Sequence, residues 1–221
     1  LEEQHPGALI ARITGARKGA LYDGLFDDGT CATLLASIQE ERTIAMRRGV
    51  VQATNIDLTA ERAPADTLAP ISRSVSDQSN TSVFFGKRLV FKMFRRVEAG
   101  PNPDIEIGEF LSRRGFTRVP PLVGSISYSP TRTGGGGQVP TAASSVAMLQ
   151  NYVWNQGNGW QVTIDEIERF FEHVTATPVP ADADVNAAHA WAFGLTSDPP
   201  ASVAEAIRAY LAVADILGRR T

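Results

Sequence analysis

A short apolar strand with one lysine near its centre is the feature that most constrains this chain. Residues 89–94 read Leu-Val-Phe-Lys-Met-Phe, and alternate residues of a strand point to opposite faces. Lys92 therefore shares a face with Val90 and Phe94, and this face should be at least half buried. A buried ammonium is costly unless it meets an anion. The pattern predicts a sheet that carries a cation on a covered face.

A tight turn precedes this strand and a capped helix follows it. Gly86 and Lys87 suit a tight hairpin turn between two strands. Asn102 can cap a helix, Pro103 suits its first turn, and Gly115 suits its end. The segment from residue 76 to residue 115 is thus predicted to run loop, strand, turn, strand, linker and helix.

Two glutamates of this helix are the carboxylates that could meet Lys92. Glu106 lies beside the predicted apolar face of the helix, so we assign the partner role to Glu106, with Glu109 as the second choice. A strand lysine and a helix glutamate form the ion pair that kinases use at the phosphates of ATP. The alternative is that Lys92 extends to solvent while Glu109 pairs with Arg113. The predicted apolar face consists of Ile107, Phe110 and Leu111.

The composition is that of an ordinary globular protein. The chain has 221 residues and a formal net charge of −3, which argues against a dedicated nucleic-acid binder. It contains no apolar run long enough for a membrane helix and no recognisable signal peptide. Cys31 is the only cysteine, so an internal disulfide is excluded and a reducing cytoplasm is the expected location.

The remaining patterns predict an α+β chain in three parts: residues 1–68, residues 69–154 and a helical segment at residues 155–221. Thr30 is a possible cap for an early helix, and Thr163 opens a capping-box pattern. The glycine run at residues 134–137 lacks the lysine of a phosphate loop and is interpreted as a hairpin tip. Strands are predicted near residues 8–13, 20–22, 49–53, 71–75, 122–128 and 145–153, and a last helix at residues 202–220.

Several strings follow one another in an order that is known from one protein family. They are LYDGLFD at residues 21–27, QSNTSV at 78–83, VFKMFRR at 90–96, GPNPDIEIG at 100–108, VPPLVG at 119–124 and MLQNYVWNQGNGW at 148–160. Together they resemble the N-terminal cap and N-terminal lobe of bacterial maltokinases, including forms fused behind a trehalose synthase. The resemblance implies a protein-kinase-like N-lobe, which is a mainly antiparallel sheet with one key helix. Part of a small α+β cap would precede this lobe, and helices would follow it.

The resemblance also implies a nucleotide site. Lys92 would hold the phosphates of ATP and Glu106 would orient Lys92. Backbone groups of a hinge would bind adenine near Gln150, Asn151 and Tyr152. The loop over the phosphates contains no glycine and can equally be an ordinary polar turn. Its donors would be Ser79, Asn80, Thr81 and Ser82.

The family transfers a phosphoryl group from ATP to maltose, but the residues for that step are not found in this sequence. No His-Gly-Asp type loop and no later Asp motif for Mg²⁺ follow the hinge. We therefore interpret the chain as the N-terminal part of a maltokinase that is inactive by itself, with the metal ligands and the sugar site elsewhere. Two alternatives remain open: a noncatalytic domain that docks a trehalose synthase, and the N-lobe of another small-molecule kinase of the aminoglycoside type.

Overall fold

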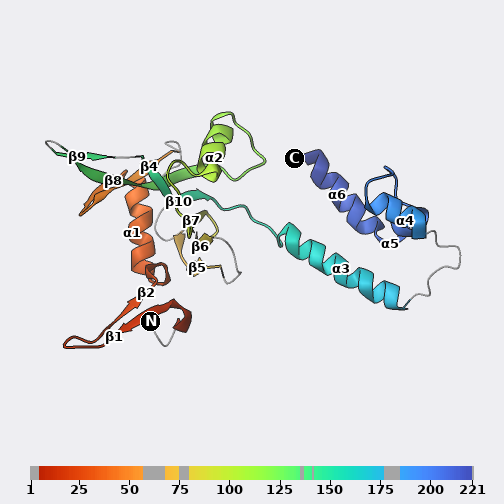
Figure 1. Cartoon of the computed structure of the whole chain (residues 1–221), viewed down its shortest axis with the longest axis horizontal. Coiled ribbons are helices and arrows are strands. Elements are labelled where there is room, and N and C mark those ends of the chain that lie inside the picture. Colours follow the sequence, from red (N-terminus) through yellow and green to blue (C-terminus); the bar gives the residue numbers. More distant parts are fainter. Residues whose placement is uncertain are drawn as a thin grey trace. The chain divides into compact units, whose positions relative to one another are not determined.

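The computed structural model describes residues 5–56, 68–74, 80–134, 137–140, 142–176 and 185–220. The contacts within the chain divide it into two compact units, Leu1–Trp154 and Asn155–Thr221. Each unit is described by itself, and Figure 1 labels their elements.

The first unit is built on an eight-stranded sheet whose strand pairs are all antiparallel. The strand order is β3-β4-β8-β10-β7-β6-β5, and β9 pairs with β8. Strand β7 is therefore an inner strand between β10 and β6, while the short β5 is an edge strand. The bounds are β3 Thr43–Met46, β4 Gly49–Asn55, β5 Ile71–Arg73, β6 Asn80–Phe85, β7 Leu89–Phe94, β8 Leu122–Gly134, β9 Gly137–Pro140 and β10 Ser144–Asn151.

A separate two-stranded sheet stands near the N-terminus. Strand β1 (Leu9–Ile13) pairs antiparallel with β2 (Gly19–Tyr22), as predicted, and most of their residues are exposed. Short 3-10 turns flank this hairpin, η1 at Pro6–Ala8 and η2 at Gly24–Phe26.

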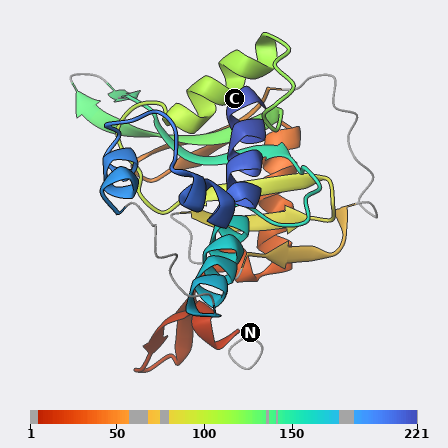
Figure 2. The same cartoon turned by 90° about the vertical axis from the view of Figure 1, so that its right-hand side faces the viewer.

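Helix α1 (Asp28–Gln39) covers one face of the large sheet and runs behind the yellow strands in Figure 2. Its buried Leu35 and Ile38 belong to the main core cluster, together with Phe91 of β7 and other sheet residues. The predicted cap was one turn too late. Asp27 caps the helix by accepting hydrogen bonds from the backbone N–H of Thr30 (2.7 Å) and from its hydroxyl (2.8 Å).

Helix α2 (Pro103–Arg113) packs on the other face. Asn102 is its N-cap, as predicted, and Gly115 beyond its C-terminus has φ +68°. The predicted buried face was wrong, because Ile107 and Phe110 are 57% and 55% exposed. The helix instead buries Ile105, which forms a second core cluster with Phe94, Leu122 and Met148.

The second unit consists of helices only, within its described residues. Helix α3 begins at Gly159, where Asn158 accepts a hydrogen bond from the N–H of Gln161, so Thr163 lies inside the helix and does not cap it. The predicted last helix is interrupted at Ile207. The bounds are α3 Gly159–Ala176, α4 Val185–Ala192, α5 Ala201–Ala206 and α6 Arg208–Arg220.

The chain therefore has the predicted α+β class, a large antiparallel sheet with several helices. The three-part division at residues 68 and 154 stays a prediction, and the sheet takes strands from both sides of residue 68. Among the described residues, no helix has the length and the apolar character needed to cross a lipid bilayer.

Candidate functional site

Lys92 lies on the inner strand β7, on the face of the sheet that carries α2. Its cross-strand neighbours are Ser82 of β6 and Met148 of β10, and directly paired residues share a face. Met148 and Phe94 contact Ile105 of α2 in the second core cluster, which identifies the face. Lys92 is partly buried, as the alternation in the sequence predicted.

The pairing of β6 with β7 places the predicted polar loop residues on both faces of the sheet. Asn80 pairs with Phe94 and Ser82 pairs with Lys92, so both lie on the lysine face. Thr81 faces the other side and accepts a hydrogen bond from Nε of Arg95 at 3.2 Å. Ser79 lies outside the described residues. Two of the four predicted phosphate-loop residues thus share a face with Lys92.

Neither predicted glutamate is paired with Lys92. Glu109 forms an ion pair with Arg113 at 2.5 Å, which is the pairing that the alternative interpretation gave. Glu106 is exposed and lines a small hollow of about 260 Å³ on α2, together with Glu109 and Arg113. Within the described part of the chain, Lys92 has no ion pair. The role of Glu106 stays a prediction.

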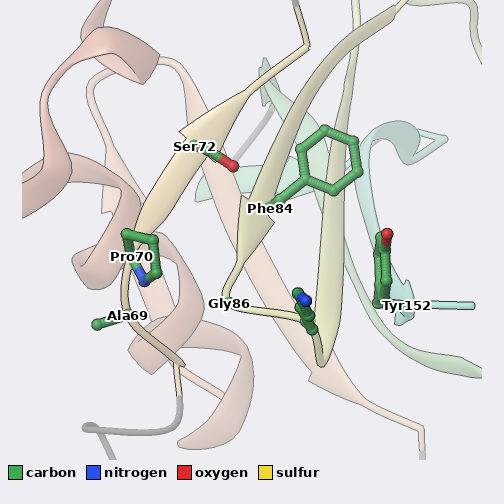
Figure 3. Close-up of a pocket in the computed structure, with 7 residues that line it drawn as sticks. Ala69, Pro70, Ser72, Phe84, Gly86 and Tyr152 are labelled. Carbon is green, nitrogen blue, oxygen red and sulfur yellow. The ribbon is translucent and has the colours of Figure 1, made fainter. Parts of the chain in front are cut away.

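An open pocket of about 550 Å³ lies at the end of the sheet near the predicted hinge (Figure 3). Phe84 and Tyr152 form one wall, with their ring centroids 6.1 Å apart and their planes at 81°. Phe84 pairs with Val90 two residues before Lys92, so the pocket lies on the lysine face. Its lining residues are Ala69, Pro70, Ser72, Phe84, Gly86, Lys87 and Tyr152.

The predicted hinge residues take different positions in this arrangement. Gln150 pairs with Val90 and lies on the lysine face, whereas Asn151 pairs with Leu89 on the other face. The backbone N–H of Asn151 donates to the carbonyl of Pro121 at 3.0 Å, and that of Tyr152 donates to the carbonyl of Arg88 at 2.7 Å. The backbone N–H groups of Asn151 and Tyr152 therefore both have hydrogen-bond partners within the chain.

Sequence reasoning missed most of the pocket. Phe84 could have been found, because strand alternation places it on the same face as Ser82. Pro70 and Ser72 could not, because only the pairing of β5 with β6 brings them there. No group of three or more His, Cys, Asp or Glu side chains that could hold a metal ion occurs within the described ranges.

Comparison with known proteins adds little to this geometry. No model of a known protein family matches the chain. Among solved structures, a glucosamine kinase is similar at 20% identity, with a TM-score of 0.39, over 73% of this chain and 32% of that one. The chain thus spans about a third of that enzyme's length. A likeness of this size decides neither fold nor function, and the functional assignment depends on the residues themselves.

Proposed function

We propose that this chain is the nucleotide-binding part of an ATP-dependent sugar kinase, and specifically of a maltokinase that forms maltose 1-phosphate. Two things support the proposal. The motif strings resemble those of bacterial maltokinases, and the Lys92 face combines a lysine, polar side chains and a pocket with an aromatic wall. The metal ligands, the catalytic base and the sugar site are assigned to parts of the protein outside these 221 residues.

The observation that carries the proposal is the position of Lys92. Its ammonium stands on a partly buried sheet face between Ser82 and Met148, and it has no ion pair within the described residues. A cation in such a place is stabilised when an anion arrives. The phosphates of ATP are suitable anions, and Asn80 and Ser82 on the same face provide further polar groups.

The pocket beside this face suits the base of the nucleotide. A volume of about 550 Å³ lies in the range of small-molecule sites. The aromatic wall of Phe84 and Tyr152 can contact a flat ring, and the Ser72 side chain lies on β5 across from it (Figure 3). In this proposal the base is held mainly by ring contacts, because the N–H groups of Asn151 and Tyr152 already bond within the fold.

Isothermal titration of the chain with MgATP tests nucleotide binding. Because a hydrogen bond to a charged group is worth about 1.5–3 kcal/mol, we expect Lys92→Met to weaken ATP binding by about 10- to 100-fold. Thermal stability should be unchanged or slightly higher, since the variant removes a partly buried charge. Lys18→Met, at the exposed turn before β2, is the matched control and should bind ATP normally. Equal affinity of the Lys92 variant and the wild type would contradict the proposal.

The sugar assignment needs a second experiment. The natural protein that contains this sequence is incubated with MgATP and maltose, and maltose 1-phosphate is measured beside an aminoglycoside as the alternative acceptor. Formation of maltose 1-phosphate, lost in Lys92→Met, supports the maltokinase assignment. If only the aminoglycoside is phosphorylated, the protein belongs to another class of small-molecule kinase. Failure to bind ATP at all would favour a docking domain.

A further inference from the structure

We propose that Arg73 is a positioning residue of the nucleotide site, because it clamps the edge strand β5 to the start of helix α1 from the face opposite the pocket. This inference rests on the proposed function for its ligand. The clamp itself is defined by contacts within the chain.

Three contacts hold the Arg73 guanidinium, whose side chain is only 14% exposed. Its Nη1 forms an ion pair with Oδ1 of Asp28 at 2.5 Å. Its Nε donates to the carbonyl of Leu25 at 2.8 Å, and Nη2 lies 3.6 Å from Sγ of Cys31. A planar guanidinium with several fixed donors is suited to such a multiple contact. The clamp therefore joins two segments that are far apart in the sequence.

The residues that Arg73 contacts at the start of α1 are themselves held in place by the fold. Cys31 and Leu25 are buried, and the Cys31 thiol donates to the same Leu25 carbonyl at 3.2 Å. Asp27 caps α1 beside them. Burial lowers the pKa of Arg73, but the hydrogen bond to Asp28 leads the effects that oppose it, and the net pKa is raised. Arg73 therefore keeps its charge.

Strand β5 is a short edge strand to which the Arg73 side chain adds a link with α1. It is three residues long and lies at the edge of the sheet, where β6 is its only strand neighbour among the described residues. Arg73 pairs with Val83 on the α1 face, and Ser72 pairs with Phe84 on the pocket face. Fixing Arg73 thus fixes the strand that carries Ser72 in the pocket wall.

The same strand also joins the polar part of the cradle. The N–H of Ser74, directly after β5, donates to the carbonyl of Ser82 at 3.0 Å. Ser82 is the cross-strand neighbour of Lys92. By fixing β5, Arg73 therefore supports both the pocket wall at Ser72 and the strand residue Ser82 beside Lys92, although Arg73 itself lies on the opposite face.

Hydrogen exchange of the free chain, measured by mass spectrometry, tests the clamp without any nucleotide. In Arg73→Met we expect exchange at least about 10-fold faster in peptides that cover β5 and β6, with β8 and β10 unchanged. Arg42→Met is the matched control, because Arg42 pairs at 2.7 Å with Glu40 at the other end of α1, where both side chains are exposed. Unchanged exchange in β5 and β6 would overturn the clamp.

Titration with MgATP then tests positioning. We expect ATP affinity to fall by about 3- to 30-fold in Arg73→Met and to be partly rescued in Arg73→Lys, which keeps the charge for Asp28. Normal ATP affinity together with faster exchange would overturn the positioning role. If the wild-type chain binds no ATP while Arg73→Met still shows faster exchange in β5 and β6, the proposed function is overturned and the clamp stands.

A second variant is used if Arg73→Met does not fold. Asp28→Asn should also speed hydrogen exchange in β5 and β6, by a smaller factor, and exchange equal to that of the wild type would overturn the clamp.

Discussion

At the scale of single residues, Asp27 shows how a side chain fixes the start of α1 and makes its stability depend on pH. Its carboxylate accepts hydrogen bonds from both the hydroxyl and the backbone N–H of Thr30. These bonds lower the pKa of Asp27 below its ordinary value of 3.8, the hydroxyl bond first and the backbone bond second. A carboxyl group with a lowered pKa in the folded state stabilises the fold above its unfolded pKa. That contribution is lost as the pH falls through the folded pKa.

The matching prediction uses Asp27→Asn, since asparagine is also a good N-cap but has no charge. At about pH 7 the wild type should be the more stable of the two in urea unfolding, because only its cap is charged. As the pH falls below 3.8, the difference should shrink and then vanish. A difference that stays constant down to about pH 3 would show that the charge of Asp27 contributes nothing.

Residue patterns were sufficient to place Lys92 on its sheet face but not to show which side of α2 packs on the sheet. Alternation along β7 requires no knowledge of the rest of the chain, so the face of Lys92 could be predicted from the strand alone. The assignment of Glu106 depended on which side of α2 packs against the sheet. That side is decided by contacts of Ile105 with Leu122 and Met148, which lie far along the sequence.

At the scale of elements, two glycines with different surroundings should respond to alanine in opposite ways. A Cβ on Gly108 of α2 would lie 3.8 Å from Cβ of Leu122, an ordinary contact. A Cβ on Gly124 of β8 would collide with Cγ2 of Ile38 and lie 2.7 Å from the carbonyl oxygen of Thr54. We expect Gly108→Ala to stabilise the fold by about 0.5–1 kcal/mol. Gly124→Ala should destabilise it by about 1–3 kcal/mol.

Urea unfolding of the two variants beside the wild type measures both effects. Because the substitution is the same, changes in the unfolded chain largely cancel in the comparison. Destabilisation by Gly108→Ala would mean that α2 and β8 lie too close together to admit an added methyl group. A neutral Gly124→Ala would mean that α1 does not pack tightly over this strand.

Elements were predictable where their signals are local. The bounds of α2 follow from Asn102 and Gly115, and both act as expected. The start of α3 was misplaced, because the Thr163 pattern also occurs inside a helix, where its hydroxyl bonds back to Gly159. The pocket was least predictable, since it needs the pairing of β5, β6 and the segment after β10.

At the scale of the whole molecule, the buried core belongs to the first unit. Both core clusters consist of residues before Trp154, and no residue of α3 is fully buried. We therefore expect a chain ended after Trp154 to unfold cooperatively, with a thermal midpoint within a few degrees of the full chain. Calorimetry of the two proteins measures this. Loss of the cooperative transition on truncation would show that the first unit needs the helices of the second.

The most direct test of the central claim is to locate ATP on the chain by NMR. In a titration of the isotope-labelled chain with millimolar MgATP, amide shifts are expected on the Lys92 face, at Ser82, Phe84, Lys92 and Tyr152. The β1–β2 hairpin should serve as an unperturbed reference. Shifts on that face in the wild type, which need an ATP concentration about 10- to 100-fold higher in Lys92→Met, are the predicted result. Shifts confined to other elements, or none at all, would contradict the assignment of this face as a nucleotide site.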